Sequence, residues 1–412
     1  MDKKKAENYA KLLVQVGVNV QIGQTVVLQV SSDDLQLARE ITKAAFEVGA
    51  KDVVVHIEDP VIKRYRALYA TLEVLSDVPQ WKKDSLDHYL KDDGVSLAMV
   101  STYPNLFEGV DNDKALALGE AENQLRNEIR KYFHSGKLQW NLTVWPNQKW
   151  AEAVYPELSP TAAFLQLEED LCTINRVGSD NNPIKEWAEH CERLKVIADA
   201  LNKANFKSLH ITTGLGTDLY MDLVKDHIWS SAAGNTGTKA KAAYIANMPT
   251  EEIATDPDFR SVNGVAVASF PLMLSGKLIK DFSLTFKDGL AVACQAQENE
   301  EVLKDILFKD ERSRSLGEVA LVSKYSPIKL LQRVFYNGLI DENAASHLAF
   351  GSSFPDSIKG GNQMSEAELL QHGVNVSPIH VDFMIGTDDM KVVGRDFDGK
   401  ETVIMEDGDF CL

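Results

Sequence analysis

The sequence predicts an α/β protein with two domains, an N-terminal parallel-sheet α/β domain and a C-terminal β-rich α+β domain. In the first half of the chain, apolar strand-like segments alternate with amphipathic helical segments, which indicates a parallel sheet with helical crossovers. From about residue 208 the pattern changes to short β-type runs separated by turn residues. We therefore expect an α/β domain over residues 1–206, with a helical bridge at its end, and a β-rich domain over residues 207–412.

Length, composition and charge limit the class of protein. The chain has 412 residues, which is enough for two domains. Its hydrophobic content of 44% and charged content of 25% are those of a folded globular protein, so a disordered or fibrous chain is excluded. The formal net charge of -18 repels nucleic-acid backbones and anionic membranes, so we expect neither as a partner.

The sequence also bears on the cellular compartment. No segment has the roughly 18 consecutive apolar residues of a membrane-spanning helix. The N-terminal segment is typical of an amphipathic helix and lacks a signal-peptide cleavage site. The cysteines are scattered and form no CxxC pair, which indicates a reducing compartment, so we expect a cytoplasmic protein. They are Cys172, Cys191, Cys294 and Cys411.

The elements of the first half follow from apolar periodicity. The segment 33–50 has apolar residues at helical spacing and a glycine, Gly49, near its end. Short apolar runs rich in β-branched residues predict strands. The expected strands are 25–30, 52–57, 95–102 and 138–146, and the expected helices are 33–50, 61–75 and 113–133, followed by helices between 160 and 206.

The second half reads as a series of short strands with one intervening helix. Glycine, asparagine and aspartate residues separate these β-type runs, as expected for antiparallel sheets with tight turns. The helix is expected near 299–307. The expected strands are 209–214, 218–224, 264–272, 281–286, 290–296, 319–322 and 378–386.

One of these strands carries the most informative polar pair. Successive side chains of a strand alternate between its two faces, so His380 and Asp382 project to the same side. An imidazole and a carboxylate in this relation form a natural metal-ligand pair. The alternative is the exposed polar face of a half-buried strand, and this segment alone does not choose between the two.

Three other segments supply further candidate ligands. Glu318 leads into an apolar strand beside a glycine that lets another group approach closely. His347 precedes a Gly-Ser-rich turn, and Glu251 and Glu252 follow a proline turn, although each of these residues also fits an ordinary solvated position. Taken together, five residues suit two divalent ions, and all lie in the β-rich domain, where we expect the metal site. They are Glu252, Glu318, His347, His380 and Asp382.

Four ordered motifs resemble those of the M29 family of metallo-aminopeptidases, the thermophilic aminopeptidase family. The resemblance covers essentially the whole chain and is especially close to staphylococcal and streptococcal members. It implies a two-metal exopeptidase that acts on peptides with a free N-terminus, works as a homodimer and uses zinc, cobalt or manganese. The motifs are NMPTEEIATDP, RSLGEVALV, FYNGLIDENAASHLAFGSSFP and NVSPIHVDFMIG.

Carried over by motif, the family's metal ligands fall on Glu252, Glu318, His347, His380 and Asp382. The chain departs from the family at two other positions. Some members have glycine where this chain has Glu251, which makes Glu251 a rival to Glu252. The family often has a tyrosine whose hydroxyl stabilises the developing oxyanion, and here Phe354 stands at that position and cannot donate a hydrogen bond.

The reaction we predict is metal-assisted hydrolysis of the N-terminal peptide bond by a metal-activated water. Glu318 or Glu251 takes the proton of that water, and the sequence does not choose between them. The alternatives are a two-metal hydrolase of another amide or ester, and a metal-binding module that is catalytically silent because of Phe354. A nucleotide-binding role is disfavoured, because the G-L-G at 214–216 lacks the rest of the dinucleotide fingerprint.

Overall fold

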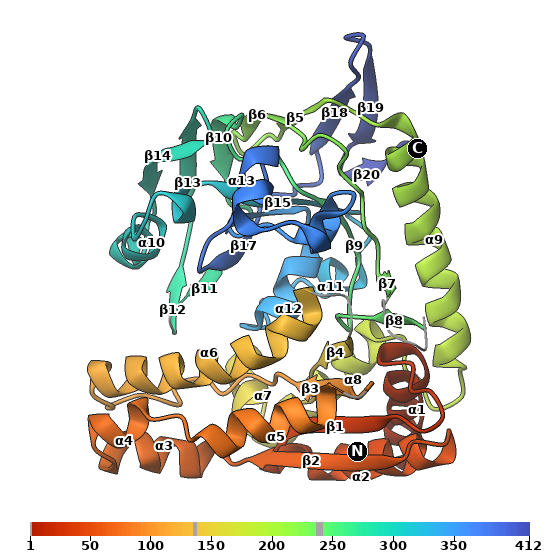
Figure 1. Cartoon of the computed structure of the whole chain (residues 1–412). Coiled ribbons are helices and arrows are strands. Elements are labelled where there is room, and N and C mark those ends of the chain that lie inside the picture. The colour runs from red at the N-terminus through yellow and green to blue at the C-terminus, as the bar shows by residue number, and fades with distance from the viewer. Residues whose placement is uncertain (1, 92, 135–137, 236–241, 275) are drawn as a thin grey trace. The chain divides into compact units, whose positions relative to one another are not determined.

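The computed structural model of the chain describes residues 2–91, 93–134, 138–235, 242–274 and 276–412. The chain forms two compact units (Figure 1). Unit 1 consists of Met1–Ala188 and Ala233–Met248, and unit 2 of Glu189–Ala232 and Pro249–Leu412. Unit 1 contains a parallel sheet and unit 2 contains antiparallel sheets, so the mixed α/β class is confirmed. The domain boundary at residue 206 stays a prediction.

Unit 1 is built on a four-stranded parallel sheet in the order β2-β1-β3-β4. All four expected strands are present. Val26, Val27 and Leu28 of the inner strand are fully buried, as is typical of a parallel sheet covered on both faces. The strands are β1 (Thr25–Ser31), β2 (Asp52–Glu58), β3 (Val95–Met99) and β4 (Gln139–Thr143).

Helices flank this sheet (Figure 1), and several of them begin at a side-chain cap. The single helix expected over 61–75 is wrong, because it is divided in two. Ala70 and Thr71 have extended backbone, and the Thr71 side chain accepts a hydrogen bond from the Val74 amide to start the second helix. These helices are α1 (Lys3–Leu12), α2 (Leu35–Glu47), α3 (Pro60–Tyr69), α4 (Leu72–Ser76), α5 (Gln80–Leu90), α6 (Asn112–His134), α7 (Gln148–Val154) and α8 (Pro160–Ile174). Helix α9 (Pro183–Ala204) begins in unit 1 and continues into unit 2.

The larger sheet of unit 2 has eight strands in the order β14-β13-β10-β6-β5-β18-β19-β20, paired antiparallel throughout. The last three strands were not predicted from the sequence. The strands are β5 (Ser208–Thr212), β6 (Asp218–Asp222), β10 (Asn263–Val267), β13 (Ser283–Lys287), β14 (Leu290–Gln295), β18 (Lys391–Arg395), β19 (Glu401–Glu406) and β20 (Asp409–Phe410).

A second antiparallel sheet of unit 2 has the order β17-β16-β15-β9. One of its faces is apolar: the ring of Phe383 lies 6.1 Å from that of Phe350 and 5.7 Å from that of Phe282, which precedes β13. This apolar face therefore packs against the larger sheet. The strands are β9 (Glu252–Thr255), β15 (Leu316–Val322), β16 (His347–Gly351) and β17 (His380–Met384).

Short elements complete both units. Two-stranded hairpins form β7 (Ala233–Asn235) with β8 (Ala243–Ile245) in unit 1, and β11 (Leu272–Leu274) with β12 (Lys277–Ile279) in unit 2. The helix expected near 299–307 is present. The remaining helices are α10 (Glu300–Leu307), α11 (Pro327–Leu330), α12 (Gly338–Asp341) and α13 (Glu366–His372).

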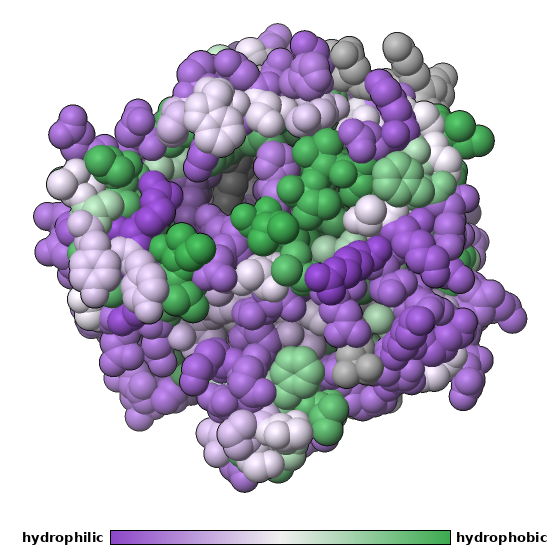
Figure 2. Space-filling model, turned by 90° about the horizontal axis from the view of Figure 1, so that it is seen from below, coloured by the Kyte–Doolittle hydropathy of each residue, from purple (hydrophilic) through white to green (hydrophobic). Residues whose placement is uncertain are grey.

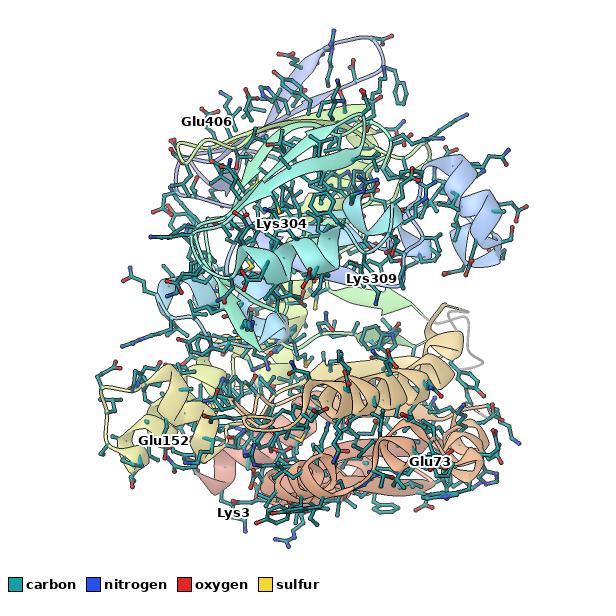
Figure 3. The ribbon with its side chains drawn as sticks, turned by 90° about the vertical axis from the view of Figure 1, so that its left-hand side faces the viewer. Lys3, Glu73, Glu152, Lys304, Lys309 and Glu406 are labelled. Atoms are coloured by element: carbon teal, nitrogen blue, oxygen red, sulfur yellow. The ribbon has the colours of Figure 1, made fainter. Side chains whose placement is uncertain are left out.

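Most of the face drawn in Figure 2 is hydrophilic. Charged side chains such as Glu73, Glu152 and Glu406 point outward (Figure 3). Hydrophobic patches interrupt one face of the molecule (Figure 2), and Ile62 and Tyr69 of α3 are among the exposed apolar side chains. Across the described residues, no helix combines the length and the apolar character needed to cross a bilayer.

Candidate metal centre

Strand register brings the predicted ligands to one face of the β17-β16-β15-β9 sheet. Directly paired residues of neighbouring strands point to the same face, as do residues two apart on one strand. In the observed pairing, Glu252 stands opposite Val322, Glu318 opposite Ala349, and Ala349 opposite Asp382. The residues that share this face are Glu252, Glu318, His347, His380 and Asp382, together with Ala254, Ala320, Val322, Ala349, Gly351 and Met384.

The small residues between the ligands leave room above the sheet. Alanine and glycine occupy the face positions that separate the five polar side chains, while the opposite face carries the large apolar residues Leu348, Phe350 and Phe383. The apolar face fixes the register, because a shift by one residue would turn every polar ligand into the core. The sheet therefore holds a polar cluster with open space at its centre.

A β-bulge aims Glu318 into this cluster. The pairing of β15 with β16 shifts between Leu316 and Glu318, so Gly317 is the extra residue of the bulge. A Cβ atom at Gly317 would lie 2.4 Å from the carbonyl oxygen of Ser352 and 2.5 Å from that of Gly351. Only glycine allows this close backbone approach, as the sequence predicts for the residue before Glu318.

The five side chains form two overlapping groups of three. In the first group, the Glu252, Glu318 and His347 ligand atoms all lie within 4.8 Å of one another, and the His347 Nε2 is 3.2 Å from the Glu252 Oε2. In the second, the His380 Nε2 is 3.2 Å from both the Glu318 Oε2 and the Asp382 Oδ1. Glu318 belongs to both groups and is buried.

Backbone carbonyls orient both imidazole rings. The Nδ1 of His347 lies 3.2 Å from the Ala345 carbonyl oxygen, and the Nδ1 of His380 lies 2.6 Å from that of Ser352. Because a carbonyl can only accept, Nδ1 carries the proton in each ring. Each Nε2 therefore directs its lone pair at the carboxylates, the arrangement found in metal-ligating histidines.

The donor set fits a cation. A neutral Nε2 and a carboxylate oxygen that are 3.2 Å apart are two electron-rich atoms, and they repel unless a positive charge lies between them. The Asp382 Oδ1 is buried and has no hydrogen-bond partner among the described residues. Protons or divalent ions can supply the missing charge, and mixed carboxylate and imidazole ligands suit zinc, cobalt or manganese.

In the ion-free protein, protons on the two histidines supply this positive charge. Burial lowers the pKa of His347, but the hydrogen bond and charge of Glu252 and the charges of Asp382 and Glu318 outweigh it and raise it to about 10. Burial likewise opposes the protonated form of His380, and the carboxylates of Asp382 and Glu318 still raise its pKa well above the usual range. The positive charge of His380 in turn outweighs the effect of burial on Asp382 and lowers its pKa.

Glu342, which the sequence did not single out, lies close enough to the cluster for the charges of Asp382 and Glu252 to act on it. Burial first, and then the charges of Asp382 and Glu252, raise the pKa of its carboxyl well above the ordinary value. It lies in the short 3-10 turn Glu342–Ala344, which contacts β17 and α11. Its only signal in the sequence is its place in the DENA segment, five residues before His347.

Among the described residues, Glu251 belongs to neither ligand group. Its backbone amide donates to the Asn343 Oδ1 at 2.7 Å, and its carboxylate is 3.7 Å from the Nε2 of buried His190. That same Nε2 lies 2.8 Å from the Thr250 carbonyl oxygen. Adjacent residues of an extended segment point to opposite sides, so Glu251 faces His190 while Glu252 faces the cluster.

Phe354 lies beside the second group. Its ring centroid is 4.8 Å from that of His380, in an edge-to-face arrangement, and the side chain is 44% exposed. The ring therefore covers His380 and still presents surface to an incoming molecule. It contributes no hydrogen-bond donor at this position.

Comparisons with known proteins cover the whole chain. The profile of the family described as thermophilic metalloprotease (M29) matches residues 2–410. The chain is 38% identical to Aminopeptidase AmpS of Bacillus subtilis over 408 residues, which is 99% of this chain and 98% of the relative. It is 36% identical to Aminopeptidase PepS of Streptococcus thermophilus over 410 residues, covering 100% and 98%.

A solved structure shows the same arrangement of elements. Wild-type AmpT from Thermus thermophilus superimposes with a TM-score of 0.92 at 32% sequence identity, and the match covers 100% of both chains. At this similarity the two chains share one fold from end to end.

Proposed function

The chain belongs to the thermophilic metalloprotease (M29) family and is a metal-dependent aminopeptidase, and from this premise we propose that it removes N-terminal residues from peptides with two divalent ions. The observation that carries the proposal is the pair of three-residue groups that share Glu318. Glu252, Glu318 and His347 would hold one ion, and Glu318, His380 and Asp382 would hold the other. We expect zinc, cobalt or manganese in both positions.

When bound, the two ions supply positive charge for the scissile carbonyl and lower the pKa of a coordinated water. The residues of the chain orient the ligand atoms and attract the substrate. His347 and His380 present Nε2 in fixed orientations, because their Nδ1 atoms are held by carbonyls. The carboxylates of the cluster attract the free amino group of the peptide, which explains removal of the terminal residue alone.

Glu318 is the residue we propose to move protons during the reaction. It accepts the proton of the attacking water and passes it to the leaving amine. Its position between the two groups and its burial support this role. Glu251 is the alternative acceptor of the water proton. Its carboxylate points toward His190, which makes it less suited to this role.

We also propose that the protein is a homodimer, as its family resemblance implies, and that it is cytoplasmic, as its scattered cysteines indicate. The mass of one chain is 45.7 kDa. Light scattering on purified protein is expected to give about twice that mass. A single-chain mass at micromolar concentration contradicts the dimer and leaves the activity proposal untouched.

The experiment that tests the function is hydrolysis of aminoacyl-p-nitroanilides by metal-stripped protein that is titrated with cobalt, zinc or manganese. We expect ion-dependent release of p-nitroaniline from free-amine substrates and none from their N-acetylated counterparts. Equal release from acetylated substrates contradicts an aminopeptidase. Hydrolysis of other amides or esters in preference to these substrates favours the wider two-metal hydrolase.

Phe354 favours one further candidate function, a metal-binding protein that does not turn over substrate. The loss of one oxyanion donor costs on the order of a hundredfold or more in rate. This candidate predicts two bound ions per chain by elemental analysis, with no p-nitroaniline released under any ion. Turnover above the ion-free background excludes it.

A further inference from the structure

Glu252 lies at the end of an edge strand. It is the first residue of β9, which is the last strand in the order β17-β16-β15-β9. Towards the sheet, Glu252 stands opposite Val322, the last residue of β15. On the outer side of β9, Ala254 exchanges two backbone hydrogen bonds with Ser230, at 2.8 and 3.0 Å. Because the end of an edge strand has few neighbours, the position of Glu252 depends on how the residues before it are held.

The side chain of Asn343 holds the residue that precedes Glu252. The Asn343 Oδ1 accepts a hydrogen bond from the Glu251 amide at 2.7 Å, and Asn343 is fully buried. The Asn343 Nδ2 donates to the Leu339 carbonyl oxygen at 3.2 Å. Because a carbonyl can only accept, this second bond turns the carboxamide so that its oxygen faces Glu251. The carboxamide thus joins the start of β9 to the helical turns that lead to β16.

The same turn also positions His347. Asn343 lies in the 3-10 turn Glu342–Ala344, and the next residue, Ala345, supplies the carbonyl oxygen that lies 3.2 Å from the His347 Nδ1. Strand β16 then begins at His347. A displacement of this turn would therefore move the His347 ring as well as the start of β9. Two of the three residues of the first group depend on it.

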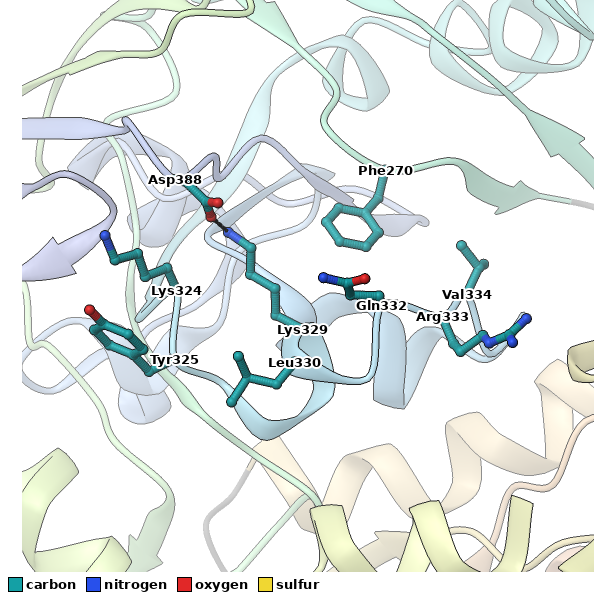
Figure 4. A pocket seen from close by; sticks show the side chains of 9 residues that line it. All are labelled: Phe270, Lys324, Tyr325, Lys329, Leu330, Gln332, Arg333, Val334 and Asp388. Atoms are coloured by element: carbon teal, nitrogen blue, oxygen red, sulfur yellow. Dashed lines mark hydrogen bonds and ion pairs between the residues drawn. The ribbon is translucent and has the colours of Figure 1, made fainter. Parts of the chain in front are cut away.

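The turn is anchored on α11. The Ser326 hydroxyl, at the N-terminal cap of α11, donates to the Asn343 carbonyl oxygen at 2.7 Å. Helix α11 also carries Lys329, whose ammonium forms an ion pair with Asp388 (Figure 4). These contacts fix the backbone of Asn343, so its side chain links β9 to a rigid support.

The second group is oriented by a different segment. The His380 Nδ1 lies 2.6 Å from the Ser352 carbonyl oxygen, and both His380 and Asp382 belong to β17. Within the described part of the chain, the hydrogen bonds of Asn343 lead to β9, α11, α12 and its own turn, and none leads to Ser352 or to β17. A change of this side chain therefore acts on one of the two groups.

We propose that Asn343 is a positioning residue for the first of the two ions, the one assigned to the group of Glu252 and His347. The inference rests on the proposed function and adds a residue that distinguishes the two ion positions. The carboxamide keeps the Glu252 Oε2 and the His347 Nε2 at a separation of 3.2 Å, where both can reach one ion. Loss of a group that orients a metal ligand typically lowers metal affinity by about tenfold to a hundredfold.

The test measures cobalt binding to metal-stripped, full-length protein in which one ion position is removed. The His380→Ala protein keeps the first group intact, and the His347→Ala protein keeps the second. We expect Asn343→Leu to lower the cobalt affinity of the His380→Ala protein by about tenfold to a hundredfold. In the His347→Ala protein, the same change should leave the affinity within about twofold, as for independent sites. Calorimetric titration and the visible absorption of bound cobalt measure both affinities.

Two further variants test the hydrogen bond itself. Asn343→Asp keeps an acceptor for the Glu251 amide and should retain the affinity of the first group. Asn343→Ser, whose hydroxyl is too short to reach that amide, should lower the affinity and replaces Asn343→Leu if the latter does not fold. Asn175→Leu is the matched control and should change neither affinity. Asn175 is a fully buried residue of unit 1 whose Nδ2 donates to the Leu171 carbonyl oxygen at 2.8 Å.

The outcomes separate this inference from the proposed function. An equal loss of affinity in both single-ion proteins overturns the inference, because it indicates a general loosening of unit 2. Unchanged affinity in every Asn343 variant, or an Asn343→Asp protein as weak as Asn343→Leu, also overturns it. A wild-type protein that binds two ions leaves the proposed function standing in each of these cases. A wild-type protein that binds fewer than two ions contradicts the proposed function, and the inference with it.

Discussion

At the scale of single residues, the two histidines set how the site responds to pH. Carboxylates surround His347 and His380, and without ions they keep both imidazoles protonated at neutral pH, with the pKa of His347 at about 10. A divalent ion needs the neutral ring as a ligand. Metal and protons therefore compete for the same Nε2 atoms.

We expect each ion to displace one proton when the stripped protein is titrated at pH 7. Its apparent affinity should then rise about tenfold per unit of pH up to the pKa of the histidine that it binds. Calorimetric titration in buffers of different ionisation enthalpy measures the released protons. A binding heat that is independent of the buffer contradicts proton displacement.

Glu318 is the residue whose loss should affect both ions. We expect Glu318→Gln to lower the bound metal below two ions per chain and kcat by about a thousandfold or more, because the amide can neither bridge ions nor accept a proton. Metal content by elemental analysis and p-nitroanilide kinetics check this. Glu366→Gln, on the exposed side of α13, is the control and should behave like wild type. Full activity of Glu318→Gln removes this residue from the centre.

Phe354→Tyr should restore the donor that the family often has at this position. The ring already lies 4.8 Å from that of His380, so the added hydroxyl extends from a fixed group. We expect kcat to rise by about tenfold to a hundredfold with little change in KM, since the hydrogen bond strengthens only as the oxyanion forms. An unchanged kcat means that another group already donates a hydrogen bond to the oxyanion.

At the scale of elements, the bulge of β15 determines where Glu318 points. We expect Gly317→Ala to destabilise unit 2 by about 1–3 kcal/mol, because its Cβ meets two carbonyl oxygens that cannot move without breaking the sheet. It should also lower metal affinity. Gly338→Ala is the matched control, since its Cβ meets nothing within 4 Å. Denaturant unfolding measures both variants, and equal stability of the two contradicts the steric account.

The elements that the sequence predicts are those with a strong local pattern. The four parallel strands and helix α2 have continuous apolar runs or clear helical spacing, and they are correct. Strand β16 was not predicted, because its five residues HLAFG are buried on both faces and show no alternation. The break between α3 and α4 was also not predicted, because Thr71 is a cap only in the context of the fold.

The site residues also differ in whether one segment of the sequence is enough to predict them. The relation of His380 to Asp382 follows from strand alternation within one segment. The convergence of Glu252, Glu318 and His347 depends on the pairing of three strands, which no single segment contains. The family resemblance supplied that link. Glu342 lies in a turn, where neither periodicity nor pairing marks a side chain as part of a site.

At the scale of the whole molecule, a buried carboxyl makes the stability of unit 1 depend on pH. Asp34 is fully buried, and burial raises its pKa to about 6 from an ordinary value of 3.8. The folded state therefore holds the proton more tightly than the unfolded state. The stability from this proton is complete below about pH 4 and is lost as pH rises through about 6.

We expect Asp34→Asn to raise the stability of unit 1 at pH 7 by up to about 3 kcal/mol and to leave it almost unchanged at pH 4. The amide keeps an acceptor for the Ser31 backbone amide and carries no charge to bury. Hydrogen exchange of the β1 and β3 amides across this pH range measures the effect. A variant that is equally destabilised at both pH values contradicts it.

The metal centre draws its side chains from four strands that lie between residues 252 and 382 of the chain. During folding, each of these strands must find a partner that is distant in sequence, and such pairings form slowly. An immature or misfolded chain therefore has no assembled hydrolytic centre. Because further strands and helices separate the ligands in sequence, the proposed removal of peptide ends arises only in chains that have completed this part of their folding.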